Sequence, residues 1–230
     1  MLKKTNLFII LMVCFIALFM VSCGNPETIA PVSGDGSPSN EPSQDIKKQV
    51  ALTFDDGPHP LYTEQLLDGL KERGAKVTFF LMGKNAQLYP ELVERMNEEG
   101  HLVGNHTYSH LGLTTANHQA FLEEVEATND VIEEITGKTP EYLRPPYGTW
   151  DVTLEDELEM FAVLWNVDPL DWCSTDVKNI TNNVINKVKD GDIVLMHDFT
   201  ATSVTAALDI VDHLLEEGYE FVTVEDIFLE

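Results

Sequence analysis

Basic residues are scarce in this sequence. Its 230 residues contain 14 Lys and Arg against 39 Asp and Glu, which gives a formal net charge of −25. A protein that binds nucleic acid needs clustered Lys and Arg to contact phosphate groups, so nucleic acid is not an expected partner. The same scarcity argues against adhesion to an anionic lipid surface through basic side chains.

Cysteine is also scarce. No hydrophobic run reaches the roughly 20 residues that a membrane-spanning helix needs. The three cysteines are too few for a disulfide framework. A hydrophobic fraction of 43% with 23% charged residues excludes a disordered chain. The length supports one good-sized domain or two small ones.

The N-terminus has the pattern of a bacterial lipoprotein signal peptide. Lys3 and Lys4 precede an apolar run from Leu7 to Val21, which is 15 residues long. A spanning helix needs roughly 20 apolar residues, so this run is typical of a signal-peptide core. It ends in MVSC, whose last residue is Cys23, and this resembles a lipobox. The resemblance implies cleavage before Cys23 and its lipidation, with plain secretion or an uncleaved anchor as alternatives.

The next segment is expected to be a tether. Residues 24–45 contain 4 Pro, 3 Gly and 4 Ser in 22 positions, which favours a flexible coil with an r.m.s. span of roughly 25 Å. We therefore expect a signal peptide over 1–22, a lipidated tether over 23–45 and one domain over 46–230. The domain would be held at the outer face of the bacterial membrane. Its one thiol, Cys173, is expected to be buried or half-buried, with no catalytic role.

Strand-like and helix-like segments alternate from residue 46 to the end. The β-prone or continuously apolar segments are 49–54, 76–81, 101–104, 142–144, 161–167, 192–196 and 220–224. The segments with a helical spacing of apolar residues are 62–73, 90–99, 117–136 and 203–217. A glycine closes each of these four helices, as is common at helix C-termini.

Repeated β-then-α units predict a parallel sheet with right-handed crossovers. About seven such units fit in the roughly 180 residues available, whereas a full eight-unit barrel usually needs about 200 or more. The predicted fold class is therefore α/β, as a distorted and incomplete (β/α)7 barrel with parallel strands. Chemistry lies at the C-terminal ends of the strands in that architecture, and the polar motifs fall at those ends.

Asp55 and Asp56 end the first predicted strand, in the sequence TFDDGP. Adjacent carboxylates at a buried strand end repel each other and are costly unless a cation offsets them. The Gly-Pro pair breaks the strand, so both side chains can turn toward one point. Asp-Gly-Pro is also a common turn composition, and a plain turn is the alternative.

His106 and His110 follow the third predicted strand, in HTYSH. Two His four residues apart can face one metal if the stretch forms a helical turn. Chance alone yields roughly 0.2 such pairs in a chain of this composition, so the pair by itself is a weak signal. With an Asp from another strand end, two His leave a position open for water, which suits a catalytic Zn²⁺ site.

Three further motifs place polar side chains after later strands. RPPYG begins at Arg144, and its prolines can stiffen a loop that presents the Arg to an acidic cluster. DPLDW ends in Asp171 and Trp172, which could orient a His and wall an apolar pocket. LMH ends in His197, well placed as a general acid or base. The alternatives are a proline-rich turn, a core Trp beside a solvated Asp, and a structural His. A structural role is expected for the remaining histidines, which are His59, His101, His118 and His213.

Together the five motifs resemble those of the polysaccharide deacetylase family, the NodB-homology domain of carbohydrate esterase family 4. TFDDGP, HTYSH, RPPYG, DPLDW and LMH occur in the family order over roughly residues 46–228. Five ordered matches at strand ends are a specific signal, whereas any one alone is not. The family fold, a distorted (β/α)7 barrel, agrees with the unit count.

The resemblance implies a role for each matching residue. Asp55 would be the catalytic base, and Arg144 would orient it. The ligands of a divalent metal would be Asp56, His106 and His110. Zn²⁺ is the expected metal, with Co²⁺ or Ni²⁺ as alternatives.

The later motifs would supply the remaining groups. His197 would be the catalytic acid, supported by Asp171. The backbone N–H of Tyr147 would help to hold the oxyanion. Trp172 and Leu195 would shape the pocket for the acetyl group.

The function implied by the resemblance is metal-dependent removal of N-acetyl groups from N-acetylglucosamine in a cell-surface polysaccharide. A lipid-anchored protein would meet peptidoglycan first, so peptidoglycan is the expected substrate. An exopolysaccharide, chitin oligomers or O-acetyl xylan are alternatives, as are an inactive glycan-binding lipoprotein and a metal phosphoesterase. We expect a monomer that meets the membrane only through its lipid anchor.

Overall fold

The computed structural model describes residues 47–151 and 154–229. Its strands are β1 (Lys48–Asp55), β2 (Thr78–Leu81), β3 (Leu102–Asn105), β4 (Tyr142–Leu143), β5 (Phe161–Ala162), β6 (Asp192–His197) and β7 (Tyr219–Phe221). Its α-helices are α1 (Tyr62–Arg73), α2 (Gly83–Leu88), α3 (Pro90–Glu98), α4 (His118–Thr136), α5 (Glu155–Leu158), α6 (Val177–Ile185), α7 (Ala201–Glu216) and α8 (Val224–Leu229). The expected signal peptide, Cys23 and the tether lie outside the described residues. Among the helices that are described, none is both long and apolar enough to span a membrane.

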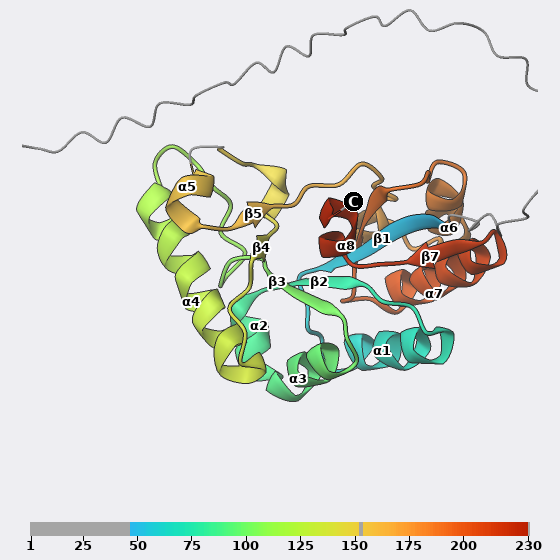
Figure 1. Ribbon diagram of the computed structural model, residues 1–230, viewed down its shortest axis with the longest axis horizontal. Coiled ribbons are helices and arrows are strands. Elements are labelled where there is room, and N and C mark those ends of the chain that lie inside the picture. Colours follow the sequence, from blue (N-terminus) through green and yellow to red (C-terminus); the bar gives the residue numbers. More distant parts are fainter. Residues whose placement is uncertain (1–46, 152–153, 230) are drawn as a thin grey trace, which may run out of the picture. The chain divides into compact units, whose positions relative to one another are not determined.

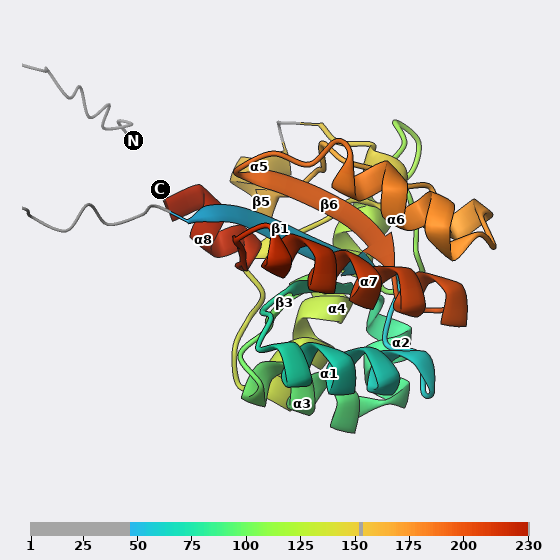
Figure 2. The same cartoon turned by 90° about the vertical axis from the view of Figure 1, so that its right-hand side faces the viewer.

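The strands pair in parallel in one sheet. Their order is β5-β4-β3-β2-β1-β6, and β7 also pairs with β1. Helices α1, α3, α4 and α7 lie along the outer face of this sheet (Figures 1 and 2). Beyond β5 the chain crosses to β6, where Val167 bridges to Val194. This bridge draws the two edges of the sheet toward each other, so the predicted distorted and incomplete barrel is confirmed.

The helices agree with the prediction where glycine marks their ends. The predicted helix over 62–73 matches α1, and Gly74 ends it with a left-handed backbone (φ 65°). Gly137 ends α4 in the same way (φ 72°). Four helices were not predicted, namely α2, α5, α6 and α8. The short helix α2 has 6 residues, and α6 begins at Val177, just after Asp176, whose side chain accepts the N–H of Asn179 as an N-cap.

Two predicted strands were too long. The apolar run 161–167 forms β5 only as far as Ala162, and Val167 then pairs with β6 instead of β4. The pairing partner changes along this run, so a continuous apolar sequence does not give a continuous ladder. The predicted strand 220–224 ends at Phe221, and α8 begins at Val224.

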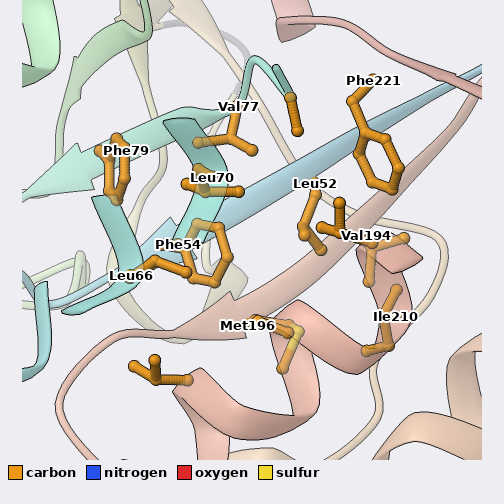
Figure 3. Packing of buried hydrophobic residues seen from close by; sticks show 14 of the residues in the cluster. Leu52, Phe54, Leu66, Leu70, Val77, Phe79, Val194, Met196, Ile210 and Phe221 are labelled. Atoms are coloured by element: carbon orange, nitrogen blue, oxygen red, sulfur yellow. The ribbon is translucent and has the colours of Figure 1, made fainter. Parts of the chain in front are cut away.

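The two faces of β1 have different neighbours. The outward side chains of Leu52 and Phe54 pack with residues of α1, β2, β6 and α7, as Figure 3 shows. Ala51 faces the other way, into a cluster with Phe80 and Val163. Because side chains alternate along a strand, Asp55 lies on the same inward face as Ala51. The apolar pattern of β1 therefore directs the first Asp of TFDDGP into the barrel.

Phe54→Ala should lower the free energy of unfolding by about 3–5 kcal/mol. Phe54 is 0% exposed and stacks on Phe79 with ring centroids 5.5 Å apart, so truncation leaves a cavity in a packed cluster. Urea unfolding followed by circular dichroism measures the change. Leu88→Ala is the control, because Leu88 is 67% exposed and its truncation should cost less than about 0.5 kcal/mol. Equal effects of the two substitutions would contradict this core assignment.

Candidate metal centre and catalytic groups

Three predicted metal ligands come together at the carboxyl ends of β1 and β3. Oδ1 of Asp56 lies 3.5 Å from Nε2 of His106 and 3.4 Å from Nε2 of His110. The three ligand atoms all lie within 4.8 Å of one another. We call these residues the metal cluster. The close approach of three donor atoms is what a single bound ion requires.

The donor set of the metal cluster fits a divalent metal. Oδ1 of Asp56 is buried and has no hydrogen-bond partner, which is costly for a carboxylate oxygen unless a cation lies beside it. Nδ1 of His106 donates to the carbonyl oxygen of Arg144 at 2.6 Å. That bond assigns the proton to Nδ1 and leaves the Nε2 lone pair for a metal. Two imidazoles and one carboxylate also leave positions for water, as in catalytic zinc sites.

The stretch from His106 to His110 is an irregular loop and not the helical turn on which the predicted pairing depended. Thr107 (φ 59°) and His110 (φ 67°) both have a left-handed backbone. These two residues fold the loop so that the imidazole rings meet at 60°, with centroids 5.0 Å apart. The two histidines therefore face one point because of the loop conformation and not because of helical periodicity.

Neighbouring side chains hold this loop. A left-handed backbone costs a non-glycine residue about 1–2 kcal/mol, so it needs compensating contacts. Oδ1 of Asn105 accepts the N–H of Thr107 at 2.7 Å, and its Nδ2 donates to Asn129 at 2.7 Å. Glu124 of α4 accepts both the N–H and the hydroxyl of Ser109, at 2.7 and 2.5 Å. Neither Asn105 nor Glu124 was selected from the sequence. Asn105 directly precedes His106, which was the available signal, whereas Glu124 lies 15 residues from Ser109 and has no local link to the loop.

Asp55 lies beside the metal cluster and outside it. Its Oδ2 is 3.8 Å from Nε2 of His106, while its Oδ1 accepts a hydrogen bond from Nη1 of Arg144 at 2.9 Å. The Asp55 side chain is 5% exposed and that of Arg144 is 0% exposed. A buried carboxylate with one oxygen bound to a guanidinium and the other directed at the cluster is placed to accept a proton near the metal.

The buried Arg144 guanidinium is satisfied by partners from several strands. It donates to Oγ1 of Thr53 and to main-chain oxygens of Val163 and Leu164, at 2.5, 3.2 and 3.3 Å. Cζ of Arg144 lies 4.3 Å from the centroid of the Phe80 ring. Burial lowers the pKa of Arg144, and the charge and hydrogen bond of Asp55 oppose that shift. These contacts fix the orientation of the guanidinium relative to Asp55.

His197 and Asp171 form the pair that the sequence suggested. Nδ1 of His197 lies 2.9 Å from Oδ1 of Asp171, whose Oδ2 accepts the main-chain N–H of His197 at 3.0 Å. Burial alone would lower the pKa of His197. The hydrogen bond and charge of Asp171, with the charges of Asp55 and Asp56, outweigh it and raise the pKa to about 8. His197 is therefore largely protonated at neutral pH, as an acid must be.

The register of the sheet brings the acid and base candidates together. β1 and β6 pair in parallel with Asp55 opposite His197 and Thr53 opposite Leu195. Residues paired across a ladder point to the same face of the sheet, so both candidates face the barrel interior. Asp55 and His197 are 142 residues apart in the sequence, but the fold places them side by side on neighbouring strands.

The remaining predicted site residues surround the mouth of the site. Tyr147 has a left-handed backbone (φ 61°), and its 77% exposed side chain packs against His110 with ring centroids 4.8 Å apart. Trp172 is 56% exposed in the turn η3 (Asp171–Cys173), whereas Leu195 on β6 is buried. The two aromatic side chains are therefore exposed to solvent, and the leucine is enclosed by the protein.

Asp198 is a buried polar residue that the sequence analysis did not single out. Its Oδ2 accepts the hydroxyl of Thr63, and burial raises its pKa to about 7. A Cβ on Gly57 would lie 2.5 Å from the same carboxylate oxygen, so glycine is needed there for space. Asp198 thus packs the chain just after Asp56 against the end of β6. Its place directly after His197 was the available signal.

The other histidines lie outside the metal cluster. His101 is buried, and burial with the positive charge of Lys76 lowers its pKa to about 4. His118 is exposed and His213 is partly buried, and they pair with Glu157 and Glu217, at 2.9 and 3.2 Å.

One expectation about cysteine was wrong. Cys173 is exposed and not buried or half-buried. It lies in the turn after Asp171, where Asp171 itself takes the buried position and directs the next two side chains outward. The choice of buried residue in this turn depends on the hydrogen bonds to His197, and no local apolar pattern shows it.

Comparisons with known proteins identify the family of this chain. A family model described as polysaccharide deacetylase matches residues 43–163. The peptidoglycan-N-acetylmuramic acid deacetylase PdaC of Bacillus subtilis is 42% identical over 190 residues, which are 83% of this chain and 41% of that protein. A peptidoglycan-N-acetylglucosamine deacetylase of Bacillus cereus is 36% identical over 192 residues, which are 79% of this chain and 69% of that protein. This chain thus spans less than half the length of the Bacillus subtilis protein.

Solved structures have the same fold. The structure of PdaC superimposes with a TM-score of 0.77 at 43% identity, over 79% of this chain and 90% of that chain. A family 4 acetyl xylan esterase from Clostridium thermocellum, solved with a cobalt ion, has a TM-score of 0.74 at 35% identity, over 79% of this chain and 91% of that chain.

The family match covers more than half of the chain, and the relative from Bacillus subtilis exceeds 30% identity over most of it. The five motifs lie in the family order, and the sheet has the fold of the solved relatives. The chain therefore belongs to the polysaccharide deacetylase family.

Proposed function

We propose that this protein is a metal-dependent hydrolase that removes N-acetyl groups from N-acetylglucosamine residues of peptidoglycan. One arrangement carries the proposal. Asp55, bound to Arg144, lies beside the metal cluster and opposite His197 across the β1–β6 ladder. Amide hydrolysis needs a base, a group that stabilises an oxyanion and an acid in close proximity. This arrangement supplies candidates for all three.

The names of the relatives support a glycan substrate. One relative is named for N-acetylmuramic acid of peptidoglycan, one for N-acetylglucosamine of peptidoglycan and one for acetyl xylan. We favour N-acetylglucosamine of peptidoglycan, because a protein tethered outside the membrane would meet peptidoglycan first. N-Acetylmuramic acid is the second candidate, since the Bacillus subtilis relative that carries that name is 42% identical. An exopolysaccharide, chitin oligomers and O-acetyl xylan remain to be compared directly.

The metal cluster would hold the cofactor, for which we propose Zn²⁺ with Co²⁺ or Ni²⁺ as alternatives. Two His and one carboxylate with open positions form a donor set of catalytic zinc sites. A bound metal supplies Lewis acidity, which acidifies a water molecule and polarises the acetyl carbonyl.

The protein side chains would move the protons. Asp55 takes a proton from the attacking water, whose oxygen adds to the acetyl carbon. The main-chain N–H of Tyr147 donates to the carbonyl oxygen as it becomes negative. His197 gives its Nε2 proton to the sugar nitrogen while the C–N bond breaks, which releases acetate and a free amine. Arg144 keeps Asp55 oriented, and Asp171 keeps His197 oriented and protonated.

Two other functions fit less well. An inactive glycan-binding protein needs neither a base nor an acid, yet Asp55 is buried beside the cluster and His197 lies opposite it across the β1–β6 ladder. A phosphoesterase with two metal ions about 4 Å apart needs more ligands than the three-residue set found in the described residues.

Purified protein should release acetate from peptidoglycan or from N-acetylglucosamine oligomers, and a chelator should abolish the release. Acetyl xylan and a muramic-acid substrate complete the panel, and mass spectrometry locates the lost acetyl group. Release that returns when Zn²⁺ is added back supports the proposal. No release from any glycan by the Zn²⁺- or Co²⁺-loaded protein would refute it.

Asp55→Asn should reduce kcat at least about 100-fold, because the amide cannot act as a base. Metal binding should be largely intact, since Asp55 is not among the three ligands. Acetate release and metal titration measure the two effects. Asp209→Asn, a change of the same kind on the exposed face of α7, is the control and should have full activity. Full activity of Asp55→Asn would show that the base is another group.

Asp171→Asn should shift the alkaline limb of the kcat/KM profile to lower pH. The acid His197 must be protonated, so activity of the wild type should fall as the pH rises through about 8, which is its pKa beside Asp171. The amide has no negative charge to offset the pKa-lowering effect of burial, so the pKa of His197 falls. Profiles of both proteins across the neutral and alkaline range measure the shift. An unchanged alkaline limb would exclude this role for Asp171.

We also propose that Cys23 is lipidated and tethers the domain to the outer face of the membrane. The sequence MVSC at the end of the apolar run and the Pro-, Gly- and Ser-rich segment after it support this anchor. Cys23→Ser should move the protein from the membrane fraction to the medium and abolish labelling by a fatty-acid analogue. Cys173→Ser is the matched control and should change neither. Membrane retention and labelling of Cys23→Ser would contradict the anchor.

A further inference from the structure

We propose that Asn85 is a positioning residue for the metal cluster, and that α2 braces the two turns that carry the metal ligands. The inference rests on the proposed metal-dependent function. Asn85 touches neither a ligand side chain nor the expected position of the substrate. It acts through the main chain of Asp56, which it holds in one conformation.

The first turn is held by a side chain and a main-chain group at the start of α2. Nδ2 of Asn85 donates to the carbonyl oxygen of Asp56 at 2.7 Å. The N–H of Met82 donates to the carbonyl oxygen of Gly57 at 3.2 Å. Asp56 has a left-handed backbone (φ 74°), which a non-glycine residue adopts only when its surroundings favour it. The two bonds fix the peptide groups on the C-terminal side of Asp56 and thereby its carboxylate.

The second turn is held by the main chain of the same helix. The N–H groups of Gly83 and Lys84 donate to the carbonyl oxygens of Thr107 and Tyr108, each at 3.0 Å. These two carbonyls belong to the loop between the ligands His106 and His110. One helix of 6 residues therefore contacts the main chain of both ligand-bearing turns.

The helix itself has little freedom to move. A Cβ on Gly83 would lie 2.6 Å from Oγ1 of Thr128 on α4 and 2.6 Å from Cδ2 of Tyr108. Met82 and Ala86 are buried, and α2 lies beside α4 (Figure 1). A fixed helix that bonds to both turns sets the separation of Asp56 from the two histidines.

Asn85 supplies the side-chain bond from α2 to the turn of Asp56, while Oε1 of Gln87 accepts the hydroxyl of Tyr108 at the second turn at 2.7 Å. The direction of the Asn85 bond separates positioning of Asp56 from helix stability. An asparagine that only stabilised α2 would bond within the helix or to its ends. Nδ2 of Asn85 has a long contact of 3.7 Å with Sδ of Met82 at the start of the helix. Its short bond of 2.7 Å leaves the helix and reaches Asp56, across a separation of 29 residues. Removing the donor should therefore loosen Asp56 more than it destabilises the fold.

Asn85→Leu keeps the size of the side chain and removes the donor. It should weaken Zn²⁺ binding about 10-fold or more, the usual effect of losing a group that orients a metal ligand. Competition against a chromogenic chelator measures the affinity, and the visible spectrum of the Co²⁺-loaded protein should change with the ligand geometry. Asn186→Leu is the matched control. It removes an amide-to-carbonyl bond of 2.8 Å at the end of α6, and it should leave affinity and spectrum unchanged.

Asn85→Ala is the second variant, for the case that leucine does not fit. Either variant with a wild-type thermal midpoint, wild-type Zn²⁺ affinity and wild-type Co²⁺ spectrum would overturn the proposal. At saturating Zn²⁺, a fall in kcat with little change in KM supports positioning of the metal cluster, since the glycan contacts are untouched. If the wild-type protein binds Zn²⁺ but releases no acetate, the proposed function fails while the affinity test of Asn85 still stands.

Discussion

Two neighbouring carboxylates must diverge at the end of β1, and the rest of the site depends on how they do so. Asp55 still belongs to the strand and points into the barrel, where Arg144 binds it. Asp56 has a left-handed backbone and turns its carboxylate toward two histidines. Side by side in a buried place, the two charges would repel each other strongly. The change of backbone conformation between them gives Asp55 a guanidinium as its positive partner and leaves Asp56 facing two imidazoles, where a divalent metal would fit.

Strained backbone gathers at the motifs of this protein. In the described residues, the non-glycine residues with positive φ are Asp56, Thr107, His110, Tyr147, Glu159 and Leu170. All of these except Glu159 lie in TFDDGP, HTYSH, RPPYG or DPLDW. Such conformations persist only where surrounding contacts outweigh their cost, and here Asn105, Glu124 and the start of α2 provide those contacts. The loops of the site are therefore shaped by residues outside the motifs.

The parallel sheet brings these loops to one place. Asp55 is paired with His197 across the β1–β6 ladder, and the N–H of Arg144 donates to the carbonyl of Asn105, next to His106. Carboxyl ends of parallel strands meet at one edge of a sheet, so residues from four distant strands share one site. The protein as a whole is strongly acidic. At the point where the carboxylates converge, the buried Arg144 and the protonated His197 supply positive charge.

The sequence alone was enough to predict the parallel α/β barrel, because apolar periodicity and glycine stops are local signals, as at α1 and Gly74. It was also enough to select Asp55, Asp56, His106, His110, Arg144, Asp171 and His197, because these residues stand in ordered motifs at strand ends. Tertiary structure decided the features for which the local sequence contains no signal. The end of β5 depends on a change of pairing partner. The exposure of Cys173 depends on the hydrogen bonds of Asp171. The close approach of His106 and His110 depends on a loop with left-handed backbone. Asn85 and Asp198 act through a hydrogen bond and through packing to residues 29 and 141 positions away, and such contacts exist only once the chain has folded.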